Sequence, residues 1–452
     1  MKLTVIGTGY VGLCQGAAFA EEGHHVTCID IAERKIRMLN DFCAGVSEEL
    51  PIFEPGLDEL IRNNCKAGRI KFTTNLKDGI EDADVVFITV GTPPKENGEA
   101  DLTALKKVSE DVGNAMDESK KDYFIIATKS TVPVGTHKIV KEIISKMTDK
   151  EFDIVSNPEF LAQGRAVKDC LSPSRIVIGT DSERARIIML EIYKPYKDQG
   201  VNIYLMGNLD AELHKYAANS YLAAQVSLTN NLANLAKAVG ADWSKVKEGI
   251  LADTRIGKFV HSSPGFGGSC FEKDVEQLTC TFKHYSVDCT LLKEVLRQNK
   301  LQKQLLAERI KERLGSLKGK TIAVWGLAFK AETDDMRGAP SIPLIKELIQ
   351  AGAKVKAYDP AAIEEAKKVF ADFEGKSSIE YVGDRYTVLE DCDALAIVTE
   401  WKEFAYANLS EIKRILKQPI IFDGKDILDV EDVKANKLYY SSIGKPDIKG
   451  EQ

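Results

Sequence analysis

The chain has 452 residues, a length that suits two or three domains. With 44% apolar residues it has the composition of an ordinary globular protein, and no run of about 18 apolar residues predicts a transmembrane helix. The net charge of −7 argues against a nucleic-acid or anionic-membrane partner, because such partners favour a basic surface.

The nine cysteines are odd in number and include no Cys-x-x-Cys pair. This pattern predicts neither a disulfide framework nor a zinc site, and no other metal site is expected. The N-terminal apolar run reaches Gly7 too early for a signal peptide. We therefore expect a reducing compartment, the cytoplasm.

The first predicted elements form a strand–turn–helix–strand unit. A strand at Leu3–Ile6 leads into Gly-Thr-Gly-Tyr-Val-Gly at residues 7–12, and a helix to about Glu22 precedes a strand at His25–Ile29 that ends at Asp30. The glycine pattern alone is weak evidence. A strand before it and an acid after the second strand are typical of a dinucleotide-binding site.

Each residue of this unit has an expected role. Gly7 makes the turn, Gly9 lets a pyrophosphate approach the backbone, and Gly12 packs the helix on the strand. Asp30 would accept hydrogen bonds from the adenosine ribose and repel a 2′-phosphate, which favours NAD over NADP. Lys35 either contacts the ribose or phosphate or is a solvated helix charge.

Further strands are predicted at residues 84–90, 124–128, 154–155, 176–179 and 201–205. Thr92, Thr131 and Glu159 each follow one of the first three. Any one of them alone is more often a turn or cap residue, but ligands of a doubly wound sheet bind outside the carboxyl ends of its strands. Their shared placement therefore predicts a site.

The longest helix is predicted from Leu209 to Val239, at about 45 Å long enough to join two domains. Lys215 and Asn219 are four residues apart and share one face within an apolar stretch. This favours a buried functional ammonium over a solvated charge. His214 points elsewhere and is interpreted as a core or surface histidine.

Residues 265–274 read Gly-Phe-Gly-Gly-Ser-Cys-Phe-Glu-Lys-Asp and contain the strongest candidate for chemistry. The glycines would let a bound molecule approach the backbone. Cys270 would lie near a helix N-terminus, where N–H groups and Lys273 favour the nucleophilic thiolate. A single cysteine is more often an inert core residue, but the glycines, Lys273 and Asp274 favour a reactive one. A helical region is expected next, at about 289–314.

Strand patterns begin again in the last third. Strands are predicted at 321–325, 354–358, 394–398 and 420–422, with a helix at 340–351 and a frayed tail after Gly444. The expected fold is α/β, with two Rossmann-like doubly wound domains joined by a long central helix. The second domain lacks G-x-G-x-x-G, so it is expected to hold something other than a second dinucleotide.

Four segments together resemble one known family. They are residues 7–12, Asn-Pro-Glu-Phe-Leu at 157–161, the 265–274 segment, and Gly-Leu-Ala-Phe-Lys at 326–330 with Thr-Asp-Asp-Met-Arg at 333–337. In this order, and over essentially the whole length, the chain resembles the UDP-glucose/GDP-mannose dehydrogenase family. The resemblance implies an NAD-binding domain at 1–205, a central helical dimerisation domain at 206–316 and a UDP-binding domain at 317–452, in a homodimer or a higher oligomer.

The resemblance also implies roles for individual residues. Those implied in catalysis are Cys270, Lys215, Asn219, Asp274, Thr131 and Glu159. Those implied in NAD contacts are Gly7, Gly9, Tyr10, Val11, Gly12, Asp30, Lys35, Thr92, Thr131, Glu159, Lys273 and Arg337. Those implied in substrate contacts are Glu159, Phe160, Leu161, Lys215, Asn219, Arg255, Phe259, Gly265, Phe266, Gly267, Cys270, Phe329, Lys330 and Lys425, with Arg255 resembling an arginine donated across the subunit interface.

Two segments depart from the family's usual pattern. Ala162-Gln163-Gly164 stands where the family usually has Arg-Glu-Gly, which puts the substrate contacts of that turn in question. Asp423-Gly424-Lys425 stands where the family often has Asp-Gly-Arg. A lysine can still pair with phosphate, but as a point charge rather than a fork.

The reaction implied is an NAD-dependent four-electron oxidation of UDP-glucose at C6 to UDP-glucuronate, a step of nucleotide-sugar metabolism. Asp274, through a water, would take the alcohol proton during the first oxidation. Cys270 would then attack the aldehyde, since a bare aldehyde has no alkoxide from which a second hydride can leave. Lys215 and Asn219 would stabilise the resulting oxyanion.

The second oxidation would leave a thioester, and Thr131 and Glu159 would position the water that hydrolyses it. The alternative substrates are GDP-mannose and a UDP-N-acetylhexosamine. A non-catalytic NAD-sensing or scaffold protein would have no need of the Cys270 constellation, whereas redox sensing through Cys270 is compatible with the enzyme.

Overall fold

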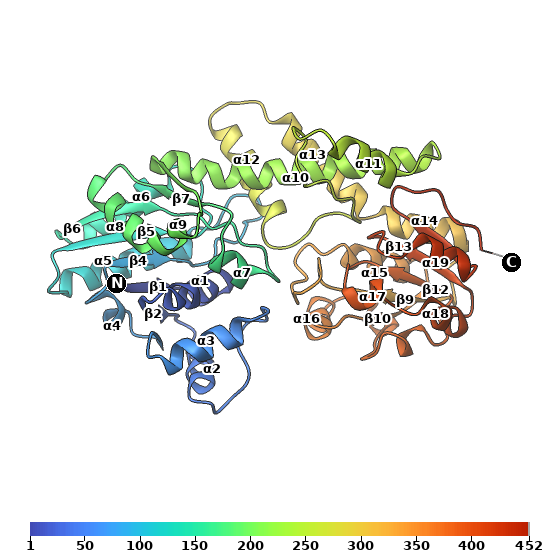
Figure 1. Ribbon diagram of the computed structural model, residues 1–452, viewed down its shortest axis with the longest axis horizontal. Coiled ribbons are helices and arrows are strands. Elements are labelled where there is room, and N and C mark those ends of the chain that lie inside the picture. The colour runs from blue at the N-terminus through green and yellow to red at the C-terminus, as the bar shows by residue number, and fades with distance from the viewer. Residues whose placement is uncertain (451–452) are drawn as a thin grey trace. The chain divides into compact units, whose positions relative to one another are not determined.

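The computed structural model describes residues 1–450 (Figure 1). The chain divides into two compact units. The first contains Met1–Ala218 and Cys280–Ser286, and the second contains Asn219–Thr279 and the chain from Val287 onward. Each unit is built around its own parallel sheet.

The first unit contains an eight-stranded sheet in the order β3-β2-β1-β4-β5-β6-β7-β8 (Figure 1). All its strand pairs are parallel except β6 with β7. The strand order reverses between β1 and β4, and ligands of such sheets bind at this switch point. The strands are β1 Lys2–Ile6, β2 His25–Ile29, β3 Ile70–Thr73, β4 Val85–Ile88, β5 Tyr123–Thr128, β6 Glu151–Ser156, β7 Ile176–Gly179 and β8 Ile203–Met206.

Helices cover both faces of this sheet, so successive strand residues enter two different cores. Val5 packs into the core that contains α1, and Ile6 packs into the opposite core beneath α5 and α6. The helices are α1 Tyr10–Glu21, α2 Glu33–Cys43, α3 Leu57–Lys66, α4 Leu76–Ile80, α5 Thr103–Glu118, α6 Thr136–Met147, α7 Ala166–Leu171, α8 Glu183–Ile192 and α9 Lys194–Asp198.

The long helix α10, Asn208–Ala238, belongs to both units, because the division falls after Ala218. Its small buried residues Ala211, Ala223 and Ala233 allow close packing. The helix expected at 209–239 is therefore confirmed to within one residue at each end. It is followed by α11 Trp243–Leu251, α12 Phe271–His284, α13 Thr290–Gln302 and α14 Leu305–Leu314, the last two replacing the single helical region expected at 289–314.

The second unit contains a six-stranded, fully parallel sheet in the order β11-β10-β9-β12-β13-β14. Its strands are β9 Thr321–Trp325, β10 Lys354–Tyr358, β11 Ile379–Tyr381, β12 Ala394–Ile397, β13 Ile420–Asp423 and β14 Tyr439–Ser442. Its helices are α15 Ser341–Gln350, α16 Ile363–Val369, α17 Lys402–Ala405, α18 Leu409–Ile415 and α19 Val430–Ala435, with short 3₁₀ turns η1 Lys376–Ser378 and η2 Thr387–Leu389. The two-sheet α/β fold class is thereby confirmed.

The turn after β9 of the second unit resembles the turn after β1 of the first unit. Gly326 donates its N–H to the Tyr358 carbonyl, as Gly7 donates to Ile29. Asp359 stands at the end of β10, and its carboxylate accepts from the backbone N–H groups of Leu327 and Ala328. The indole of Trp401 donates to the same oxygen. This acid is buried and accepts hydrogen bonds from groups of its own unit.

Two expectations need correction. Cys43 and Cys65 form a disulfide between α2 and α3, with their Cα atoms 5.6 Å apart, a pairing that no local spacing reveals. The tail does not fray at Gly444, because Tyr440 and Ile448 form a bridge with bonds of 3.1 and 2.9 Å. Within residues 1–450, no helix is both long and apolar enough to cross a membrane.

Candidate functional site

The glycine turn of the first unit is closely packed at Gly12 and open at Gly9, where a pyrophosphate is expected. A Cβ added to Gly12 would lie 1.9 Å from the Gly7 carbonyl oxygen, so only glycine lets α1 begin so close to β1. Gly7 has a positive φ of 105°, which favours glycine. A Cβ at Gly9 would meet nothing within 4 Å, so this side of the turn is open for a pyrophosphate.

Asp30 is held as an anion at the end of β2. Its Oδ2 accepts from the N–H and the hydroxyl of Thr8, both at 2.8 Å, and its Oδ1 accepts from Ala32 N–H at 2.9 Å. Burial alone would raise the pKa of Asp30, but these donors and Lys35, with Nζ at 3.6 Å, hold the pKa below its usual range. The glycines and this acid therefore fit a dinucleotide with an unphosphorylated ribose, and Tyr10 and Val11 open α1 beside them.

Thr92 and Thr131 are joined directly. The Thr92 hydroxyl donates to the Thr131 carbonyl at 2.7 Å, and Thr92 is buried. The segment that follows β5 contains Thr131, and Thr92 fixes the backbone of this segment. The expected grouping of these residues at the carboxyl ends of neighbouring strands is what the structure shows.

Glu159 and Lys215 form a buried ion pair. The Lys215 ammonium lies 3.0 Å from Oε1 of Glu159, and both side chains are at most 7% exposed. The Leu161 N–H donates to Oε2 at 2.5 Å. Burial alone would raise the pKa of Glu159, but Lys215 and the Leu161 N–H outweigh it and lower the pKa. Glu159 is thus an anion whose main partner is Lys215.

A second lysine lies beneath this pair and was not identified from the sequence. Lys129 is buried and donates to Asn157 Oδ1 at 3.1 Å and to the Tyr193 hydroxyl at 3.4 Å. Burial lowers the pKa of Lys129 to about 8, against the attraction of Cys170 and Glu159. Its position at the end of β5, one residue before Ser130, was the only sequence signal that could have revealed it.

Phe160 is packed by cations rather than by apolar neighbours. The Arg175 guanidinium lies 3.7 Å from its ring centroid and the Lys215 ammonium 5.3 Å. The His214 ring meets the Phe160 ring edge-on at 5.4 Å, and Arg175 Nε lies 3.3 Å from His214 Nε2. His214 is thus a packing residue, in line with its interpretation as a core or surface histidine.

The glycines of residues 265–268 pack against the second unit's own chain, and ligand access to their backbone stays a prediction. A Cβ on Gly267 would lie 2.5 Å from the Gly338 carbonyl oxygen, and one on Gly268 would lie 2.9 Å from the Phe329 ring. One on Gly265 would lie 2.6 Å from Lys303 Cγ. Glycines are needed here because a side chain would meet the backbone at Gly267 and neighbouring side chains at Gly265 and Gly268.

Asn299 of α13 fixes this loop. Its Oδ1 accepts from the Phe266 N–H at 2.8 Å, and its Nδ2 donates to the Phe266 carbonyl at 3.0 Å. The side chain of Asn299 therefore binds both backbone polar groups of Phe266. Asn299 Nδ2 also donates to Glu272 Oε1 at 2.9 Å, and Lys303 Nζ lies 2.5 Å from the same oxygen. Asn299 is 2% exposed, and sequence reasoning missed it.

Cys270 directly precedes α12, as expected. It is partly exposed, lies outside the disulfide, and its Sγ is 3.5 Å from Ser269 Oγ. Asp274 is fully buried in the first turn of α12 and accepts from Asn219 Nδ2 at 2.6 Å and Lys273 Nζ at 2.7 Å. The ammonium of Lys273 is therefore paired with Asp274 rather than committed to the thiol.

The other predicted residues of the second unit lie around this loop or on the surface. Arg337 is exposed, forms a two-pronged ion pair with Asp335, and its carbonyl accepts from Gly268 N–H at 2.7 Å. Lys425 lies 2.7 Å from Glu400. The remaining ones are Phe259, edge-on to His261, Lys330, 5.6 Å from the Phe329 ring, and Arg255, paired with Asp253 on an exposed turn.

The predicted residues therefore fall into two groups. The first unit brings together the dinucleotide turn, Asp30, Thr131 and the Glu159–Lys215 pair, and the second brings together Cys270, Asp274 and Asn219. Helix α10 contains Lys215 and Asn219 one turn apart. The dinucleotide-binding turn of the first unit is typical of a dinucleotide-dependent oxidoreductase.

Comparison with known proteins agrees with this class. Three domains described for the UDP-glucose/GDP-mannose dehydrogenase family match the chain, namely the NAD binding domain over residues 1–197, the central domain over 209–301 and the UDP binding domain over 323–430. The chain belongs to the UDP-glucose/GDP-mannose dehydrogenase family, and its cofactor is NAD.

Individual relatives cover almost the whole chain. The UDP-glucose 6-dehydrogenase TuaD of Bacillus subtilis is 42% identical over 99% of this chain and 94% of its own length. A UDP-glucose 6-dehydrogenase of Rhizobium meliloti is 39% identical over 99% of this chain and 100% of its own. The structure of a UDP-glucose dehydrogenase from Pyrobaculum islandicum matches with a TM-score of 0.88 and 32% identity, over 98% of this chain and 97% of that one.

Proposed function

We propose that this protein oxidises C6 of UDP-glucose to a carboxylate, giving UDP-glucuronate in two successive NAD-dependent steps that share Cys270. The observation that supports this most is Cys270 at the start of α12, with the buried Asp274–Asn219 pair one turn below it. An alcohol dehydrogenase that stops at the aldehyde has no use for a thiol. A nucleophile at this point is needed when oxidation continues to the acid.

Different residues act in the two oxidations. When bound, NAD⁺ supplies the hydride acceptor for each oxidation. Asp274 takes the proton of the C6 hydroxyl through a water, and the Cys270 sulfur then bonds to the aldehyde carbon, leaving an oxyanion. Lys215 and Asn219 donate to that oxyanion, as preorganised donors that contribute about 3–4 kcal/mol each. The carboxylates of Glu159 and Asp274 hold these donors in fixed directions.

Release of the product needs hydrolysis of a thioester on Cys270. Glu159 has a lowered pKa, so it is a weak base at neutral pH and is better suited to orient a water than to deprotonate it. Thr131, whose backbone Thr92 fixes, supplies the second contact to that water. Loss of the thioester makes the overall sequence irreversible.

The substrate can be tested by counting product. Purified protein with limiting UDP-glucose and excess NAD⁺ should form two NADH per sugar, and GDP-mannose and UDP-N-acetylhexosamines should give less than a tenth of that rate. The Cys270→Ser variant should form no more than one NADH per sugar. Uronic acid formed by Cys270→Ser at near the wild-type rate would refute the covalent scheme, and faster oxidation of GDP-mannose would refute the substrate.

We also propose that the segment 206–316 is a dimerisation domain and that a second copy of the chain covers α10. Tyr221, Leu228 and Leu235 are 70%, 60% and 58% exposed and recur every seven residues, which places a continuous apolar stripe on one helix face. Leu213 and Val239 extend it. A stripe of this length on an isolated helix face is typical of a self-association surface.

The dimer can be tested by sedimentation. Leu228→Arg combined with Leu235→Arg should convert the dimer to a monomer, whereas Tyr406→Arg, which changes an exposed aromatic residue away from α10, should not. A double variant that still sediments as a dimer would exclude this face. We place the enzyme in the cytoplasm within this proposal, because seven of its nine cysteines are free thiols, although Cys43 and Cys65 form a disulfide.

A further inference from the structure

The buried carboxylate of Glu212 joins two segments that the proposed function needs in register. Glu212 lies on α10 one turn before Lys215 and is 4% exposed. Its Oε2 accepts from the Gly135 N–H at 2.6 Å and its Oε1 from the His137 N–H at 2.8 Å, at the N-terminus of α6. The chain runs from Thr131 into this helix terminus in four residues.

Two further groups complete the contacts of this carboxylate. His137 Nδ1 lies 3.1 Å from Oε2, and the Ser156 hydroxyl lies 3.4 Å from Oε1. The Ser156 hydroxyl has a nearer acceptor in Asn208 Oδ1 at 2.9 Å, and His137 Nδ1 donates in only one of its tautomers, so the Glu212 carboxylate keeps acceptor capacity for one further donor. The two backbone contacts show that Glu212 holds the N-terminus of α6.

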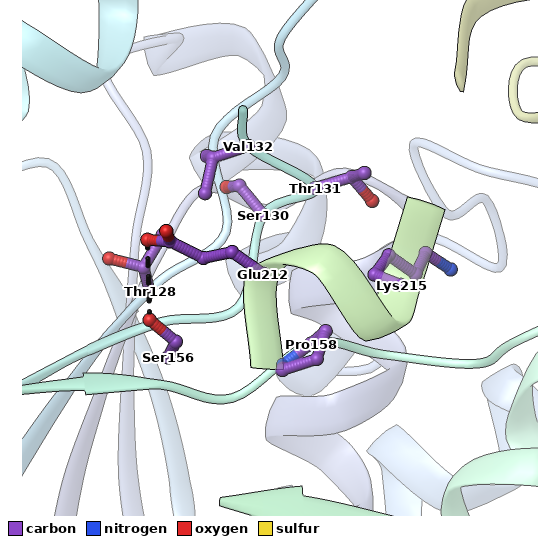
Figure 2. Close-up of a pocket in the computed structure, with 8 residues that line it drawn as sticks. All are labelled: Thr128, Ser130, Thr131, Val132, Ser156, Pro158, Glu212 and Lys215. Atoms are coloured by element: carbon purple, nitrogen blue, oxygen red, sulfur yellow. Dashed lines mark hydrogen bonds between the residues drawn. The ribbon is translucent and has the colours of Figure 1, made fainter. Parts of the chain in front are cut away.

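A small cavity adjoins this carboxylate. Figure 2 shows Glu212 turned toward Thr128 and Ser156, while Lys215 leaves the same helix in another direction. The size of the cavity is at the lower limit of what holds one water molecule. Its lining residues are Thr128, Ser130, Thr131, Val132, Ser156, Pro158, Glu212 and Lys215.

One polar atom in this lining lacks a partner. Thr128 is 3% exposed, and its hydroxyl has no hydrogen-bond partner within residues 1–450. A buried hydroxyl without a partner costs about 1–3 kcal/mol. A water in the cavity would satisfy it and reach the Glu212 carboxylate beside it.

We propose that Glu212 is a positioning residue which, together with one water bound between it and Thr128, holds the Thr131 segment in register with the turn of α10 that contains Lys215. The inference rests on the proposed function, because it assigns to this contact the alignment of the hydrolytic and oxyanion-binding groups. A carboxylate is required, since two backbone N–H groups point at its two oxygens. An amide would present its own NH₂ to one of them.

The experiment compares Glu212→Gln, Thr128→Val and wild type by hydrogen exchange and by kinetics. In Glu212→Gln, exchange of peptides spanning 131–137 and 208–218 should rise about tenfold, with β2 peptides unchanged. Its kcat for UDP-glucose should fall about tenfold or more while KM changes less than twofold. Thr128→Val, of nearly equal volume, should lower kcat about threefold by removing a partner of the water.

Each outcome decides the proposal. Unchanged exchange in Glu212→Gln would show that Glu212 does not hold the Thr131 segment, whatever the substrate proves to be. Changed exchange with unchanged kcat would overturn the positioning role in catalysis. Thr128→Val that is more stable than wild type and equally active would show a dry cavity and overturn the water. If the wild-type protein oxidises no UDP-sugar, the proposed function is refuted separately. The exchange data then still test whether Glu212 holds the Thr131 segment.

Discussion

Lys129 gives the sharpest link between this structure and a measurable pH dependence. Its ammonium is buried with two neutral partners, Asn157 and Tyr193, and burial lowers its pKa from 10.5 to about 8. The folded-state pKa lies below the unfolded-state value, so the unfolded chain binds the proton more tightly. The contribution of Lys129 to stability therefore rises with pH between about 8 and 10.5.

The size of this effect follows from the gap between the two pKa values. At neutral pH the buried charge costs about 3 kcal/mol, because each unit of pKa corresponds to about 1.4 kcal/mol. Between pH 7 and 9.5 about 2 kcal/mol of that cost should disappear as the folded state releases its proton. Tyr193 has a raised pKa from burial and so weakens the fold only at higher pH, which is why the range stops at 9.5.

The assay is urea unfolding of the first unit at pH 7, 8, 9 and 9.5, followed by pulse proteolysis with first-unit peptides quantified by mass spectrometry. The unfolding free energy of wild type minus that of Lys129→Met should increase by about 2 kcal/mol across this range. Lys120→Met removes an exposed ammonium and should leave the pH slope unchanged. A constant difference between wild type and Lys129→Met would refute the buried, titrating ammonium.

Three further predictions concern the two units separately. Gly12→Ala should lower the free energy of unfolding by about 1–3 kcal/mol or abolish folding, because its Cβ meets the Gly7 carbonyl. Gly9→Ala should keep the melting temperature of wild type and lose NAD affinity, and equal melting temperatures for both variants and wild type would contradict this. Asp30→Ser should raise the NAD Kd about tenfold or more, measured by calorimetry, and reduce the preference over NADP, since a hydrogen bond to a charged group contributes about 1.5–3 kcal/mol. Asn299→Asp should raise the KM for UDP-glucose and lower the melting temperature, because a second carboxylate would face Glu272 and the donor to the Phe266 carbonyl would be lost; an unchanged KM would separate the loop from substrate binding.

The elements that were predicted well are those whose patterns are local. The apolar strands of both sheets, the glycine turn and the acid at Asp30 follow from periodicity and from the steric demands of a close helix approach. Helix α10 was placed to within a residue because its apolar pattern runs unbroken up to Gly240. Cys270 at the start of α12 likewise follows from its glycine-rich neighbours.

The residues that were missed are those whose partners lie far away in sequence. Glu212 contacts Gly135, and Asn299 contacts Phe266, across 77 and 33 residues. Nothing near either residue marks it, because an acid or an amide within a helix is usually solvated. The pairing of Cys43 with Cys65 was missed for the same reason. The glycines of 265–268 pack closely within their own unit, and ligand access to them stays a prediction, since both demand the same absence of a side chain.

The proposed function needs a general base, and Glu159 and Asp274 are its candidates. Each carboxylate accepts a hydrogen bond from a lysine ammonium, but the two ammonium groups differ in burial. Glu159 faces the cation of Lys215, and that attraction, together with the Leu161 N–H, lowers the pKa of Glu159. Asp274 accepts from the neutral amide of Asn219 on one oxygen and from Lys273 on the other, beside the helix turn that begins at Cys270. Within the proposed function, a proton taken by Asp274 would remove the counter-charge of Lys273, which is partly exposed, whereas one taken by Glu159 would remove it from Lys215, which is buried.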